Sequence, residues 1–100
     1  KLQDTNLQYL LNIRFSRYFL RKQDYVNAKK YAEIALELAI SIGSIERVAH
    51  SRIRLATICY NKKELNDALS LLKKALNEHV PHQKFDIYMS IAGVFIMMQK

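Results

Sequence analysis

The sequence has few of the residues that form tight turns or disulfide bonds. Its 100 residues include two glycines, one proline and one cysteine, and no tryptophan. So few turn residues exclude a fold built from many short hairpins, because each tight turn usually needs one. A single cysteine excludes an internal disulfide and is typical of a reducing compartment. We therefore expect an all-α chain in the cytoplasm.

Long apolar runs and catalytic motifs are also absent. The first residues, Lys1 to Asn6, are polar, unlike the start of a secretory signal. The longest apolar stretch near the end, Ile91 to Met98, is too short to span a bilayer. Phosphate-binding loops, nucleophile elbows and paired-cysteine motifs do not occur. His79 and His82 lack further metal ligands, so we predict no metal, no cofactor and no enzyme.

Helix-forming and basic residues are abundant instead. Half of the residues are hydrophobic, which is enough for a core, and Ala, Leu, Ile, Lys and Glu are common. Sixteen Lys and Arg outweigh nine Asp and Glu and give a net charge of +7. These charges are scattered, as on solvated helix faces, and no basic block marks a nucleic-acid tail. They favour an acidic partner, and direct nucleic-acid binding is not expected.

The chain repeats itself at an offset of forty residues. Residues 15–28 align with residues 55–68, and Ala35-Leu36 falls on Ala75-Leu76. A third copy begins at Ile91, thirty-six residues beyond the second. Because alanines seven residues apart lie on one side of a helix, the repeat predicts paired helices. Each copy starts with a large residue and a small one: Phe15-Ser16, Leu55-Ala56 and Ile91-Ala92.

This pattern resembles the tetratricopeptide repeat family, with a large-small pair and a polar turn in each copy. The resemblance implies a right-handed superhelix of antiparallel helix pairs, an α-solenoid of about five helices, with Ala28, Ala35, Ala68 and Ala75 at close helix contacts. The turns at 21–23 and 61–63 lack the family's usual glycine. The long repeat looks most like peptide-sensing bacterial regulators, with forty-residue eukaryotic scaffolds as the alternative.

Capping residues predict the helix boundaries. Asp24 caps a helix running to about Ile42, Gly43 closes it in the left-handed conformation, and Ser44 caps the next helix. We expect helix pairs over residues 4–42 and 45–79, the last helix running from Glu64 to His79, and a fifth helix over 82–99. Residues 1–100 form one repeat domain. Because the chain lacks an initial Met and stops in mid-repeat, we expect a fragment of a longer protein.

The resemblance implies that the first helix of each pair lines a peptide-binding groove. Arg17, Arg21 and Arg54 are the expected contacts, because guanidinium groups pair bidentately with carboxylates. Alternatively, these arginines pair with acids of the adjoining helix or face solvent. The matching groove positions are Leu10, Ile13, Arg14, Arg17, Leu20 and Arg21, then His50, Ile53, Arg54, Thr57, Tyr60 and Asn61, then Asp86, Met89, Ser90, Gly93 and Met97.

We therefore predict a protein- or peptide-binding repeat module whose partner is acidic or carries a free carboxylate. The alternative is a ligand-peptide-sensing or dimerisation domain of a bacterial transcriptional regulator whose DNA-binding domain lies outside this chain. The apolar C-terminal end, with Val94, Phe95, Met97 and Met98, also predicts homo-oligomerisation. Cys59 matches Phe19 and Phe95 in the repeat, so we expect it to be a small buried hydrophobe.

Overall fold

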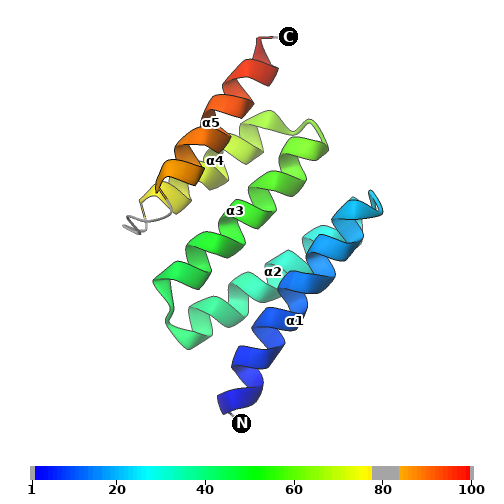
Figure 1. The fold of residues 1–100 in the computed structure, drawn as a ribbon, viewed down its shortest axis with the longest axis vertical. Coiled ribbons are helices and arrows are strands. Elements are labelled where there is room, and N and C mark those ends of the chain that lie inside the picture. Colours follow the sequence, from blue (N-terminus) through cyan, green and yellow to red (C-terminus); the bar gives the residue numbers. More distant parts are fainter. Residues whose placement is uncertain (1, 78–83, 100) are drawn as a thin grey trace.

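The described part of the chain is all-helical, as predicted. The computed structural model describes residues 2–77 and 84–99 and contains in them five α-helices and no strand. Consecutive helices run antiparallel to one another (Figure 1). None of the helices within these residues is long and apolar enough to cross a membrane. The helices are α1 (Leu2–Arg21), α2 (Tyr25–Ile42), α3 (Ile45–Asn61), α4 (Leu65–Leu76) and α5 (Lys84–Met98).

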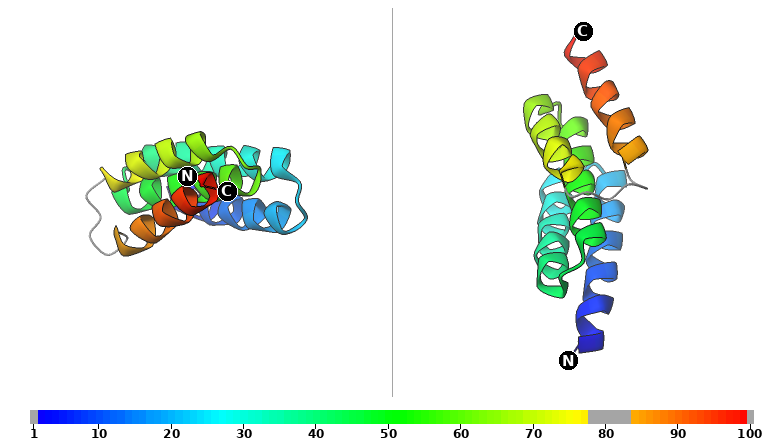
Figure 2. Two further views of the ribbon diagram at one scale, coloured as in Figure 1. Left: turned by 90° about the horizontal axis from the view of Figure 1, so that it is seen from above. Right: turned by 90° about the vertical axis from the view of Figure 1, so that its left-hand side faces the viewer.

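The helices are arranged in two layers. Helices α1, α3 and α5 lie toward one face of the molecule, and α2 and α4 lie toward the other (Figure 2). Each helix packs against the next one along the chain. The Cα atoms extend over 48 × 31 × 16 Å, and the short dimension suits two layers of helices whose axes lie about 8–10 Å apart. The two termini lie at opposite ends of the long axis (Figure 1).

The three predicted capping residues are confirmed. The Asp24 side chain accepts a hydrogen bond from the Asn27 N–H at 3.2 Å and starts α2. Gly43 ends α2 with φ of 80°. Its N–H donates to the Ala39 and Ile40 carbonyls, both at 3.0 Å, and so pairs carbonyls of the last turn. The Ser44 hydroxyl accepts from the Arg47 N–H at 3.2 Å and starts α3.

The end of α4 differs from the prediction. This helix ends at Leu76, before the expected end near His79. The Asn77 N–H is shared between the carbonyls of Lys73 and Lys74, a three-centre bond that is common where helices terminate. His79 and His82, the two histidines considered as metal ligands, lie outside the described residues.

The two turns that lack glycine have the same geometry forty residues apart. Gln23 between α1 and α2, and Lys63 between α3 and α4, have φ of 61° and 69°. The next N–H in each turn, that of Asp24 or Glu64, donates to the carbonyl five residues earlier at 2.9 or 2.8 Å. The sequence repeat is therefore also a repeat of backbone conformation. A non-glycine residue in this region costs about 1–2 kcal/mol.

Small side chains let the two layers approach closely. All four alanines expected at helix contacts are fully buried, as are three further ones: Ala28, Ala32, Ala35, Ala39, Ala49, Ala68 and Ala75. The buried Ser16 hydroxyl of α1 donates to the Ala28 carbonyl of α2 at 2.9 Å. Cys59 is buried as predicted. Burial raises the pKa of its thiol, and the charges of Glu64 and Asp67 raise it further.

Candidate functional site

The arginines of this protein are confined to two helices of one layer. The six lie on α1 and α3, at positions 14, 17, 21, 47, 52 and 54. The acids of these two helices, Asp4 and Glu46, stand in the first turns. Three carboxylates instead surround a cavity on the α2–α4 side: Glu33, Glu64 and Asp67. The rest of α1 and α3, beyond these first turns, therefore carries arginines and no acidic residue.

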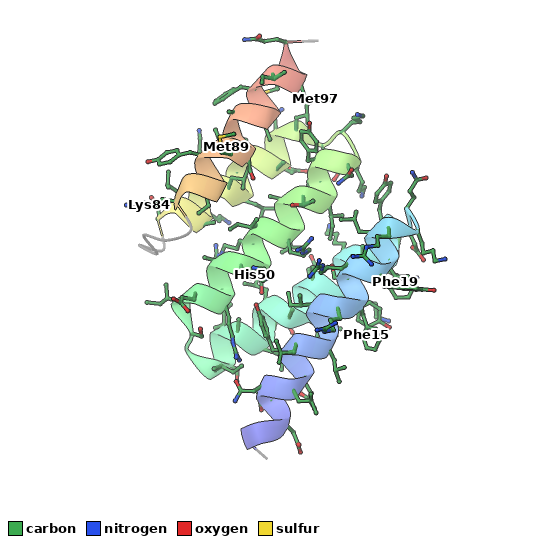
Figure 3. The ribbon with its side chains drawn as sticks, in the orientation of Figure 1. Phe15, Phe19, His50, Lys84, Met89 and Met97 are labelled. Atoms are coloured by element: carbon green, nitrogen blue, oxygen red, sulfur yellow. The ribbon has the colours of Figure 1, made fainter. Side chains whose placement is uncertain are left out.

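Arg17 of α1 lies close to His50 and Arg54 of α3. Burial lowers the pKa of His50, and the charges of Arg54 and Arg17 lower it further. Burial likewise lowers the pKa of Arg54, followed by the charge of Arg17. No carboxylate is among the groups that shift either pKa. Nitrogen-tipped side chains meet between the two helices beside His50 (Figure 3).

Arg54 is the most constrained of these cations. Its Nε is buried and has no hydrogen-bond acceptor within the described part of the chain. A buried donor without an acceptor is unfavourable by about 1–3 kcal/mol. A ligand oxygen removes this penalty only if it accepts from Nε itself, because a contact with the outer guanidinium nitrogens leaves Nε unpaired.

Aromatic packing holds α1 in the rotation that points Arg17 toward α3. Phe15 and Phe19 lie on the side of α1 opposite Arg17, and their rings lie 5.3 and 5.5 Å from the ring of Tyr31 on α2. Both point away from α3 (Figure 3). The spacing of three and four residues places two more arginines on the Arg17 side of the helix. We call the resulting surface the basic face: Arg14, Arg17, Arg21, His50 and Arg54.

A separate contact joins α1 to α3 nearer the N-terminus. The Tyr9 hydroxyl donates to the Arg47 carbonyl at 3.4 Å, and the Arg47 guanidinium lies 5.0 Å from the centre of the Tyr9 ring. The same guanidinium donates to the Asn6 side chain. Burial raises the pKa of Tyr9. Arg47 thus has partners within the protein and is not part of the basic face.

A cavity lies on the other side of α3, where α3, α4 and α5 meet. Its volume is about 230 Å³. Apolar atoms form most of its wall, and three residues contribute hydroxyl groups. A Cβ atom added at Gly93 would meet no heavy atom within 4 Å. We call this cavity the α3–α5 pocket; it is lined by Ala56, Thr57, Tyr60, Leu72, Ser90, Gly93 and Val94.

The predicted site residues divide between these two features. Arg14, Arg17 and Arg21 are exposed on α1, and His50 and Arg54 are partly buried on α3. The pocket contains four of the predicted groove residues, Thr57, Tyr60, Ser90 and Gly93. Asn61 is exposed at the end of α3, and its Nδ2 donates to the Thr57 carbonyl at 2.8 Å. Met89 is exposed on α5 and does not line the pocket.

One groove assignment is wrong, and part of the pocket was not predicted. Ile13, expected in the groove, is 7 % exposed and packs in the core beside Tyr9 and Val48. Asp86 lies on α5, but its side chain is outside what the structure describes. The pocket residues not predicted are Ala56, Leu72 and Val94. Gly93, already assigned to the groove, was the signal that could have indicated a pocket here, because a glycine inside a helix often marks a packing or functional constraint.

Comparison with known proteins adds no identification. A scan against protein-family models finds no match to this chain, and searches of curated proteins and of solved structures find none either. Within residues 2–77 and 84–99, no group of His, Cys, Asp and Glu side chains is arranged to hold a metal ion. A functional proposal therefore depends on the basic face and the α3–α5 pocket.

Proposed function

We propose that this chain is a peptide-binding module that captures an acidic segment of another protein on its basic face. The observation that carries the proposal is the approach of the exposed Arg17 of α1 to the partly buried His50 and Arg54 of α3, with no carboxylate among the groups that shift the pKa of His50 or Arg54. Guanidinium groups in such a setting form their strongest contacts with carboxylates or phosphates, often bidentately.

The arrangement of helices supports a peptide rather than a small molecule as the ligand. The basic face extends from Arg14 to Arg21 along α1, about 10 Å at 1.5 Å per residue, and continues onto α3. An extended peptide suits such an open, elongated surface. The same turn conformation at Gln23 and Lys63 favours a repeat array, and such arrays present extended binding surfaces. A solenoid of the tetratricopeptide type is part of this proposal.

The decisive variant removes two charges from the basic face. We expect Arg17→Gln with Arg54→Gln to weaken binding of a fluorescein-labelled, glutamate-rich peptide by about 10-fold or more, because hydrogen bonds to charged groups contribute about 1.5–3 kcal/mol each. The measurement is fluorescence polarisation at fixed ionic strength. An unchanged affinity contradicts the proposal.

A matched control variant loses two positive charges from α4, which belongs to the other layer of helices. Lys73 and Lys74 are exposed in the last turn of α4. Lys73→Gln with Lys74→Gln should change the affinity by less than about twofold, because exposed charges away from the ligand are screened by salt. An equal loss in this control would mean that net charge alone attracts the peptide, which contradicts a defined site.

Nucleic acid is the competing polyanion. Phosphate backbones also bind arginines, with an affinity that falls steeply with salt. The same titration with a single-stranded oligonucleotide of equal net charge should give weaker binding than the peptide. Tighter binding of the oligonucleotide, lost in the Arg17 and Arg54 variant, would replace the peptide proposal with nucleic-acid binding.

A further inference from the structure

The basic face and the α3–α5 pocket lie on opposite flanks of one helix. Around the circumference of α3, Arg54 faces α1, whereas Ala56 and Tyr60 line the pocket shared with α4 and α5. His50 and Thr57 are seven residues apart and therefore lie on one side of the helix, where His50 belongs to the basic face and Thr57 lines the pocket. Both are partly exposed. A ligand crossing α3 over these two residues would reach both features.

We infer that the captured peptide carries a bulky apolar side chain about three residues from its acidic side chain, and that this apolar side chain enters the α3–α5 pocket. The inference rests on the proposed function. An apolar cavity of about 150 Å³ holds a benzene molecule. The pocket, at about 230 Å³, therefore has room for a leucine or phenylalanine side chain.

The separation of about three residues between the acidic and the apolar side chain of the peptide follows from the width of a helix. The peptide must pass from the α1 flank of α3 to its α5 flank, a distance of about 10 Å, the diameter of one helix. An extended chain advances about 3.3 Å per residue. About three residues therefore separate the acidic group near Arg17 and Arg54 from the apolar group in the pocket.

Polar groups on α3 suit the peptide backbone between these two side chains. The Thr57 hydroxyl donates to the Ile53 carbonyl of its own helix at 3.0 Å, so its oxygen stays able to accept from a peptide N–H. His50 and Asn61 lie on the same side of α3 as Thr57. This strip offers both donors and acceptors, as an extended backbone requires.

The charge beside the pocket determines which occupant fits. A free apolar molecule would gain nothing from Arg17 and Arg54, whereas a peptide with both groups uses the pocket and the basic face together. The two features adjoin through His50 and Thr57 and therefore form one continuous surface. The occupant is an acidic peptide with an apolar anchor.

Gly93 provides a variant that fills the pocket without disturbing the fold. A side chain there starts in open space, and leucine is a better helix former than glycine by about 0.5–1 kcal/mol. Gly93→Leu should therefore fold at least as stably as the natural chain, while its side chain occupies the pocket. The matched control is Ala92→Leu, on the exposed side of the same helix turn. Ser90→Leu, one turn earlier, narrows the pocket independently.

The experiment compares two labelled peptides by fluorescence polarisation. One carries glutamate and leucine three residues apart, made in both orders, and the other has glycine in place of leucine. We expect the leucine peptide to bind the natural chain about 10-fold more tightly, as burial of one apolar side chain implies. In Gly93→Leu this ratio should fall to about one, and in Ala92→Leu it should persist.

The outcomes separate the two proposals. Equal binding of both peptides to the natural chain, or a preference that survives both Gly93→Leu and Ser90→Leu, contradicts the apolar anchor. The glycine peptide tests the basic face alone. If it does not bind, or if Arg17→Gln with Arg54→Gln leaves its affinity unchanged, the proposed function fails whatever the leucine preference. If that double variant weakens both peptides equally, charge and pocket contribute independently.

Discussion

At the residue scale, the protonation of His50 makes the charge of the basic face depend on pH. Its pKa in the folded chain lies below the ordinary value of 6.5, because burial and the charges of Arg54 and Arg17 disfavour the imidazolium. The unfolded chain therefore takes up this proton first as the pH falls. Above about pH 7 both states hold a neutral His50, so its contribution to stability is constant there.

We expect the free energy of unfolding to fall as the pH is lowered from about 7 to about 5, and to fall less in His50→Gln. Urea denaturation at several pH values measures the difference. The variant keeps a polar side chain but cannot take up a proton. Parallel pH profiles for the two proteins would contradict a lowered pKa for His50.

A bound carboxylate should reverse this effect. An anion near Arg17 and Arg54 offsets the positive charges that disfavour the imidazolium, so the pKa of His50 should rise when the acidic peptide binds. The peptide should then bind more tightly at pH 6 than at pH 8 by a margin that His50→Gln abolishes. These two pH values lie about half a unit below and about one and a half units above the ordinary histidine pKa.

At the element scale, the turn between α3 and α4 provides a stability test with an internal control. Lys63 has φ of 69° and Lys62 has φ of −81°. Lys63→Gly should raise the free energy of unfolding by about 0.5–1 kcal/mol, because relief of left-handed strain exceeds the entropy that glycine adds. Lys62→Gly should lower it by about the same amount.

Thermal denaturation measures both variants, with an expected shift of about 4–8 °C in Tm per kcal/mol. The ion pair between Lys62 and Glu64, 3.3 Å long and partly exposed, adds little to the difference. A Tm that falls in Lys63→Gly would show that the lysine side chain, rather than backbone strain, determines the stability of this turn.

The sequence predicted the elements well because their signals are local. Asp24, Gly43 and Ser44 act on backbone groups a few residues away, so the identity of each residue was sufficient. The forty-residue alignment placed the two turns at equivalent positions, and the structure adds that Gln23 and Lys63 there share a positive φ. The capping predictions needed only the chain near the residue concerned, and the repeat needed only a comparison of two segments of the sequence.

The site depends on distances between helices and was predicted only in part. Helical spacing placed Arg17 and Arg54 on the surfaces of their own helices, but could not tell that α1 and α3 bring them together. The same spacing put Ile13 in the groove, although the neighbouring helices bury it. The α3–α5 pocket forms where Leu72 of α4 and Val94 of α5 line the same space. A local sequence pattern cannot predict that residues of two helices line one pocket.

At the scale of the whole molecule, apolar side chains are exposed at both ends of the helix array. Helix α1 carries a single stripe of exposed apolar side chains, which follow one another at spacings of four and three residues: Leu7, Leu11, Phe15 and Tyr18. On α5 the exposed Tyr88 and Phe95 lie seven residues apart on one side. Apolar patches of this kind are typical of protein interfaces.

We therefore expect the chain to self-associate through α5, and the double change Tyr88→Lys with Phe95→Lys to abolish association while leaving peptide binding intact. Sedimentation velocity over about a hundredfold range of concentration measures it, since association follows mass action. The matched variant, Leu7→Lys with Leu11→Lys, tests the stripe on α1. A natural chain that sediments as a monomer at the highest concentration contradicts this expectation.

Salt distinguishes self-association from peptide binding because the two processes respond in opposite directions. A net charge of +7 makes copies of the chain repel one another, so added salt screens the repulsion and favours apolar association. The same salt weakens attraction between the basic face and a carboxylate. Raising ionic strength should therefore increase the sedimentation coefficient of the free chain and lower the affinity for the acidic peptide. If both processes strengthened together, the peptide would be binding through its apolar side chain alone.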